Sequence, residues 1–213
     1  MLDTILAIFF PRRCMGCRKP GIALCDRCLY RIRYADNSGK ETFSIYDYGN
    51  VIVRRAIKQF KYYRRSETVR DLTRAGVPLI QEFLGDVLQS THTHSFILVP
   101  IPEHPRKLRI KGFNQSTVLA KWWSNELPGS SVETLLEKIV FTVPQAKLNR
   151  STRLRNVIDT MRAVRNLNPQ AIYLIIDDVT TTGATFTEAR RALRAAGAKK
   201  IFSIALAHGY AHK

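Results

Sequence analysis

The feature that most constrains how this chain can fold is an apolar run that passes directly into two acidic residues and a threonine-rich turn. Residues 172–176 have the composition of a buried strand, and Asp177 and Asp178 follow at once. A helical pattern then extends over residues 185–196 and ends at Gly197, a residue typical of helix C-termini. A buried strand that leads through a short loop into a helix is typical of an α/β fold, in which ligands bind at the carboxyl ends of parallel strands.

The loop between this strand and helix has the chemistry of a phosphate site. Small hydroxyl residues and a glycine leave backbone N–H groups free to converge at the helix start, where they and the helix dipole bind phosphate. The two carboxylates are placed to accept hydrogen bonds from vicinal sugar hydroxyls. We therefore expect a phosphoribosyl pyrophosphate-type site; an acidic metal site of the receiver-domain kind and a simple helix cap are the alternatives. The expected residues are Asp177, Asp178, Thr180, Thr181, Thr182, Gly183, Ala184 and Thr185.

Strand and helix patterns alternate along the rest of the chain, which predicts a mainly parallel sheet. The strand patterns occupy residues 42–48, 96–99 and 201–206, and the helical patterns occupy residues 51–60, 67–84 and 115–123. Gly76 and Pro78 weaken the second helical pattern. Residues 104–112 are expected to form a loop, and residues 131–142 fit either a strand or a helix. The predicted fold class is α/β, with helices flanking the sheet.

All four cysteines of the chain lie in one short segment, as two Cys-x2-Cys pairs. Each pair places two thiolates on a tight knuckle, which suits tetrahedral Zn²⁺. Four thiolates leave the metal no open position, so its expected role is structural; two disulfides or an iron–sulfur cluster are the alternatives. We expect a helix and this zinc module over residues 1–40 and the main domain over residues 41–213. The predicted ligands are Cys14, Cys17, Cys25 and Cys28.

The charge of the chain indicates an anionic partner. Lys and Arg number 34 against 17 Asp and Glu, which gives a formal net charge of +17. Nucleic acid, anionic lipid and phosphorylated small molecules all fit such a charge, which ribosome-associated proteins also carry. Basic residues beside aromatic ones suit single-stranded DNA, which offers phosphates and base faces; a solvated helix face with core aromatics is the alternative. The predicted DNA contacts are Lys58, Lys61, Tyr62, Tyr63, Arg64 and Arg65.

The first ten residues are apolar but lack the pattern of a signal peptide, because Asp3 replaces a basic leader and no small-residue cleavage site follows. No stretch approaches the ~18 to 20 apolar residues of a membrane span. The expected location is the cytoplasm. Residues 1–10 are expected to pack as a short helix against the body of the protein, with contact to a partner or to the inner face of the membrane as the alternative.

Further motifs give the chain a resemblance to one family. The cysteines are followed by Val99-Pro100-Ile101-Pro102, Arg109-x2-Gly112-Phe113-Asn114-Gln115, then Gln145, Arg153 and Asn156, and Asp-Asp-x-x-Thr-Thr-Gly-Ala-Thr from Asp177. In this order the chain resembles the ComF/GntX-like late-competence family, which has a type I phosphoribosyltransferase domain, over residues 14–207. It departs from the family at His208, where arginine is frequent, and near Met161, where an aromatic residue is frequent. His208 is expected to be a capping or surface residue.

The resemblance implies roles for these residues. Asp177 and Asp178 would bind the ribose hydroxyls of phosphoribosyl pyrophosphate, and residues 181–185 would bind its 5′-phosphate. Arg109 and Lys111 would lie near the pyrophosphate, with Mg²⁺ held mainly by oxygens of the ligand. A flap that closes over the ligand would contain Gln145, Arg153 and Asn156.

Two functions follow from the resemblance. The first is a ComF-like competence protein that handles incoming single-stranded DNA in natural transformation, beside a DNA-translocation ATPase, and carries a phosphoribosyl pyrophosphate pocket. The alternative is an active phosphoribosyltransferase, a glycosyltransferase of nucleotide metabolism acting on an unidentified acceptor. The association of the family with DNA uptake favours the first, because the sequence identifies no pocket for an acceptor base.

Overall fold

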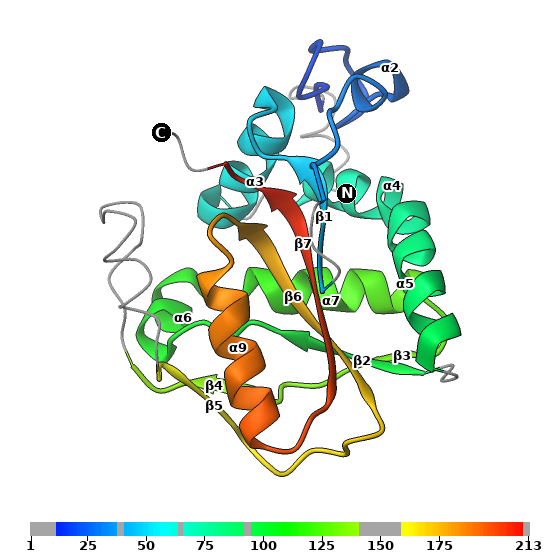
Figure 1. The fold of residues 1–213 in the computed structure, drawn as a ribbon. Helices are drawn as coiled ribbons and strands as arrows, with labels where there is room; N and C mark the ends of the chain where they lie inside the picture. The colour runs from blue at the N-terminus through cyan, green and yellow to red at the C-terminus, as the bar shows by residue number, and fades with distance from the viewer. Residues whose placement is uncertain (1–11, 38–40, 64–65, 92–94, 141–158, 211–213) are drawn as a thin grey trace.

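The computed structural model of the chain describes residues 12–37, 41–63, 66–91, 95–140 and 159–210. Its centre is a five-stranded sheet with the order β1-β7-β6-β2-β3 (Figure 1). Every neighbouring pair of these strands is parallel, so the predicted α/β fold with flanking helices is confirmed. The strands are β1 (Thr42–Asp47), β2 (Phe96–Pro100), β3 (Ser130–Val132), β6 (Ile172–Thr180) and β7 (Lys200–His208).

Several sequence-based expectations lie outside the described residues. They concern the helix expected over residues 1–10, the flap residues Gln145, Arg153 and Asn156, and the DNA contacts Arg64 and Arg65. Of Tyr63 the structure describes the backbone only.

The middle of the sheet is buried on both faces because its strands are apolar along both faces. Leu174 and Ile176 of β6 point into one hydrophobic cluster, whereas Tyr173 and Ile175 point into a second one. All four side chains are buried. Such a strand has to be covered by other elements on both sides.

Within the described part of the chain, four helices cover the face that Leu174 and Ile176 form, and their apolar residues join the same cluster. Among these residues Trp123 is fully buried, and its indole N–H donates a hydrogen bond to the carbonyl of Thr73. The helices are α3 (Val51–Tyr63), α4 (Glu67–Ala75), α5 (Val77–Thr91) and α7 (Gln115–Glu126). The single helix expected over residues 67–84 is therefore two helices, which separate at Gly76.

The opposite face of the sheet is covered by α9 (Ala184–Ala195), which lies in front of β6 in Figure 1. A ribbon of two antiparallel strands, β4 (Leu136–Lys138) and β5 (Met161–Ala163), packs beside this helix. Residues 131–140, for which the sequence allowed strand or helix, thus contain strands and no helix.

The loop expected over residues 104–112 is wrong, because α6 (Pro105–Lys111) occupies most of it. Proline is favourable at the first position of a helix, where its missing N–H has no intrahelical partner. The Nδ1 atom of His104 caps the helix by accepting from the N–H of Arg106. The helix ends at Gly112, whose φ of 75° lies in the left-handed region that glycine adopts without strain.

The cysteine segment packs directly on the sheet and its helices. Cys14, Cys25 and Cys28 belong to the same hydrophobic cluster as the helices of that face. The short helix α2 (Asp26–Leu29) ends this module, and the chain then pairs with β1 through the backbone bridge between Tyr34 and Tyr46. Among the described residues, no helix has the length and apolarity needed to cross a membrane.

Candidate functional site

The acidic pair lies at the carboxyl edge of the sheet, as the strand pattern predicted. β6 is longer than expected and continues to Thr180, so Asp177 and Asp178 lie within its last residues. β2 runs parallel to β6 and ends opposite Ile176, which brings the chain after Pro100 beside the pair. The next helix, α9, begins after Gly183, whose φ of 73° requires the left-handed region.

Asp177 is held by two hydrogen bonds to the same oxygen. Its Oδ1 accepts from the hydroxyl of Ser116, at 2.9 Å, and from the backbone N–H of Asp178, at 2.8 Å. Burial, and then the neighbouring carboxylate of Asp178, raise the pKa of Asp177 to about 7. A carboxyl group in this state changes its charge close to neutral pH.

Asp178 forms an ion pair with Lys61, which the sequence analysis predicted to contact DNA. The Nζ atom of Lys61 lies 2.8 Å from Oδ2 of Asp178, and the side chain of Asp178 is only 8% exposed. Lys61 reaches this position from α3, on which it was predicted to contact DNA. The structure therefore directs Lys61 toward the acidic pair.

A cavity of about 170 Å³ opens at this edge of the sheet. Of the residues predicted for the phosphoribosyl site, it is lined by Asp177, Asp178, Thr185 and Lys111. Arg109 is exposed on α6 and is not among the lining residues. Beside the cavity, Thr180 ends β6, Thr181, Thr182 and Gly183 form the turn, and Ala184 begins α9.

Several residues of the cavity were missed by the sequence analysis. They are Lys61, Glu103, Lys107, Ser116 and Lys138. Glu103 accepts a hydrogen bond from Lys111 at 2.7 Å and lies 3.8 Å from the Nζ of Lys107. Lys107 and Lys111 are four residues apart, so they lie on one side of α6, and Glu103 precedes that helix at the same spacing.

The cavity has an excess of positive charge, which suits an anionic ligand. Its described lining contains four lysines and three carboxylates. Burial, and then the nearby Lys107, lower the pKa of Lys138. A bound phosphate would offset both effects, because an anion favours the charged form of each lysine.

The four cysteines form a second site, which can hold a metal ion. Their Sγ atoms all lie within 4.8 Å of one another, and Cys25 is 3.6 Å from both Cys14 and Cys17. Thiolates bound to one tetrahedral Zn²⁺ at ~2.3 Å lie ~3.8 Å apart, so the arrangement fits this ion. Although burial opposes it, hydrogen bonds from the backbone of Cys17 and Cys25 lower the pKa of Cys14 to about 6. Burial raises the pKa of Cys28 to about 12, and a metal would reverse this shift by binding the thiolate.

No protein-family model matches the chain. The chain is similar to competence protein ComFC of Streptococcus pneumoniae, with 32% identity over 124 residues that cover 58% of this chain and 52% of that protein. It is similar to the DNA utilization protein YhgH of Salmonella typhi, with 30% identity over 146 residues, 68% of this chain and 62% of that protein. Competence protein F of Haemophilus influenzae is 26% identical over 106 residues, 49% of this chain and 46% of that protein.

These similarities support a ComF-like competence family. The chain spans about half to three fifths of the length of these relatives.

The basic helix α3 has two different sides. Lys58 is exposed and Tyr62 is 72% exposed, and their spacing of four residues places them on one side. Phe60 is buried and packs against Phe113 and Trp122. For this residue the structure fits the alternative in which the aromatic residues of the segment belong to the core. Lys58 and Tyr62, with the exposed Arg55, form what we call the outer face of α3.

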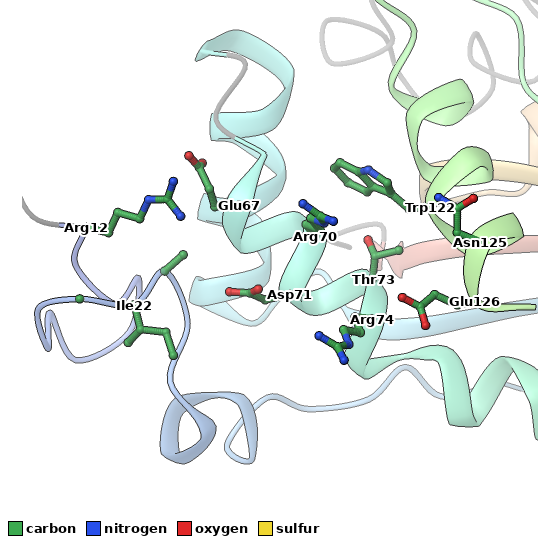
Figure 2. Close-up of a pocket in the computed structure, with 12 residues that line it drawn as sticks. Arg12, Ile22, Glu67, Arg70, Asp71, Thr73, Arg74, Trp122, Asn125 and Glu126 are labelled. Carbon is green, nitrogen blue, oxygen red and sulfur yellow. The ribbon is translucent and has the colours of Figure 1, made fainter. Parts of the chain in front are cut away.

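Two further cavities contain none of the predicted site residues. One, of about 370 Å³, lies between the cysteine module and helices α4 and α7. Figure 2 shows its charged lining, in which Arg12, Arg70 and Arg74 stand beside Glu67, Asp71 and Glu126. The other lies between α9 and the β4–β5 ribbon.

His208, which departs from the family pattern, stacks on Tyr210 with ring centroids 4.9 Å apart.

Proposed function

We propose that this ComF-like chain handles single-stranded DNA during natural transformation and binds phosphoribosyl pyrophosphate with Mg²⁺ at the carboxyl edge of its sheet. The observation that supports the pocket is the meeting of Asp177, Asp178 and Thr185 with four lysines around one cavity. Phosphoribosyl pyrophosphate needs this combination, because carboxylates accept hydrogen bonds from its sugar hydroxyls and lysines offset the charge of its phosphates.

The parts of such a ligand can be assigned to groups of the pocket. The two carboxylates would accept hydrogen bonds from the 2′- and 3′-hydroxyls of the ribose. The backbone N–H groups at the start of α9 would bind the 5′-phosphate, with Thr185 beside them. Lys107 and Lys111 would face the pyrophosphate, and Mg²⁺ would be held mainly by the oxygens of the ligand.

The outer face of α3 supports the DNA part of the proposal. It combines exposed basic side chains with a tyrosine whose ring is free to stack, on a chain with a net charge of +17. The names of the relatives refer to competence and to DNA utilization. Cytoplasmic location and an association with a DNA-translocation ATPase belong to the same proposal.

An active phosphoribosyltransferase is the second candidate. The lysines around the cavity favour it, because they could stabilise the charge of a leaving pyrophosphate. Release of pyrophosphate on adding a candidate acceptor would support this function, whereas binding without release would support a ligand-binding pocket alone.

A salt titration tests the DNA part. Fluorescence anisotropy with a labelled oligothymidine should show binding whose affinity falls with salt, at a log–log slope of about −3.5 if roughly five phosphates are engaged. Lys58→Ala should reduce that slope by about 0.7, the value for one phosphate contact with a single strand. Tyr62→Ala should lower affinity with little change in slope, because stacking releases no counterions.

Lys199→Ala provides the matched control. Lys199 is exposed and precedes β7, at the edge of the sheet opposite to the pocket, so its loss should change neither affinity nor slope. No binding at physiological salt, or equal effects of Lys58→Ala and Lys199→Ala, would contradict the proposed DNA face.

A further inference from the structure

Two lysines of α3 that are three residues apart have different surroundings. Lys58 is exposed, whereas the side chain of Lys61 is 28% exposed and its Nζ atom lies 2.8 Å from Oδ2 of Asp178. Lys61 also lines the cavity at the carboxyl edge of the sheet. The helix α3 therefore contributes one lysine to the pocket and leaves another on the surface.

The ion pair between Lys61 and Asp178 offsets the repulsion between the two carboxylates of the site. Two adjacent carboxylates that are largely removed from water repel each other, and each loses hydration in its charged form. Two other lysines of the cavity, Lys107 and Lys111, form ion pairs with Glu103. Lys61 contacts Asp178 directly.

The charged and titratable groups around the pair come from five other parts of the fold. Lys61 belongs to α3, Tyr48 follows β1, Lys138 belongs to β4, and the Ser116 hydroxyl comes from α7. The remaining groups of the cavity are Glu103, Lys107 and Lys111, from α6 and the residues before it. Lys61 lowers the pKa of Asp177, against the larger effects of burial and Asp178, and the two carboxylates raise the pKa of Lys61 despite its burial.

We propose that Lys61 is a positioning residue of the sugar site: its ammonium group is the counter-ion that favours the charged forms of Asp177 and Asp178 and holds Asp178 in place as an acceptor for ribose hydroxyls. This inference rests on the proposed binding of phosphoribosyl pyrophosphate. It separates Lys61 from the DNA contacts of α3 and assigns it to the pocket. A carboxylate has several acceptor sites, so Asp178 can bind Lys61 and a hydroxyl at the same time.

The test compares the Lys61→Met, Lys61→Arg and Lys58→Met variants with the wild type. Their affinities for phosphoribosyl pyrophosphate and Mg²⁺ are measured by calorimetry at pH 7 and at pH 9. Without the counter-ion the pair ionises at higher pH, and each unit of this shift costs up to about tenfold in affinity below the new midpoint. Lys61→Met should therefore bind about tenfold or more weakly at pH 7 and approach the wild type at pH 9, whereas Lys61→Arg and Lys58→Met should follow the wild type at both.

A carboxyl-carbon NMR titration of the ligand-free protein gives a second measurement. Lys61→Met should raise the midpoint of Asp177 above its wild-type value, and Lys58→Met should leave it unchanged. An unchanged midpoint in Lys61→Met, or an affinity loss that is equal at pH 7 and pH 9, would overturn the inference alone. Failure of the wild type to bind the ligand at either pH would overturn the proposed pocket as well.

Discussion

Gly16 lies within the cluster of four cysteines and has no room for a side chain. A Cβ atom at this position would lie 2.6 Å from Sγ of Cys28, 3.0 Å from its Cβ and 2.9 Å from Cδ1 of Ile52. The end of the isoleucine side chain can rotate away. The sulfur can do so only while it is not a metal ligand, because the metal fixes its position. Gly16→Ala should therefore weaken metal binding more than it weakens the folding of the metal-free chain.

The expected magnitude follows from the size of the overlap. Adding a methyl group to a closely packed site costs ~1 to 3 kcal/mol. If this cost falls on the metal-bound form, zinc affinity should fall by about 5- to 150-fold, at ~1.4 kcal/mol for each factor of ten. Competition with a chromophoric chelator measures the affinity, and elemental analysis of the purified wild type should find about one zinc per chain.

Gly85→Ala is the matched control. Gly85 lies inside α5, and a Cβ atom there would meet nothing within 4 Å. This substitution should leave zinc affinity unchanged and should stabilise the protein by ~0.5 to 1 kcal/mol, because alanine is the better helix former. Wild-type zinc affinity in Gly16→Ala would refute the arrangement of the cluster described above.

Two other predictions concern stability. Tyr46 is buried and its hydroxyl donates to the carbonyl of Leu72 at 2.9 Å, so Tyr46→Phe should lower the free energy of unfolding by ~1 kcal/mol in urea titrations; Tyr62→Phe, on the surface, should change it by less than ~0.5 kcal/mol. The pKa of Asp177 is raised from 3.8 to about 7. Between these pH values the folded protein holds a proton that the unfolded chain has released, so the free energy of unfolding falls as pH rises from about 4 to about 7. Asp177→Asn should therefore gain stability relative to the wild type between pH 5 and pH 8, and an equal difference at the two pH values would contradict the raised pKa.

The sheet could be predicted from the sequence because its central strands have strong patterns. Residues 172–176 are continuously apolar, and a run of this kind favours a strand buried on both faces. The helix over Pro105–Lys111 could not be recognised in the same way, since none of its residues is buried and the apolar periodicity of a packed helix is missing. Its start depends instead on a histidine cap and an N-terminal proline, which also occur in loops.

The pocket could be predicted only in part, for a physical reason. The acidic pair and Thr185 adjoin one another in the sequence, so their meeting follows from one strand and one helix start. Lys61 and Lys138 reach the same cavity from α3 and β4 through the tertiary fold. A helical pattern places a lysine on a polar side of the helix, but it does not show which carboxylate that side faces.

The central claim is tested most directly by calorimetric titration of the purified wild type and the Asp177→Asn/Asp178→Asn double variant with phosphoribosyl pyrophosphate and Mg²⁺. The wild type should bind, and the double variant should lose measurable binding, because two hydrogen bonds to charged acceptors, each worth ~1.5 to 3 kcal/mol, are weakened or lost. Circular dichroism should show that the variant is folded. Equal affinities in the two proteins, or a folded wild type that does not bind, would contradict the account.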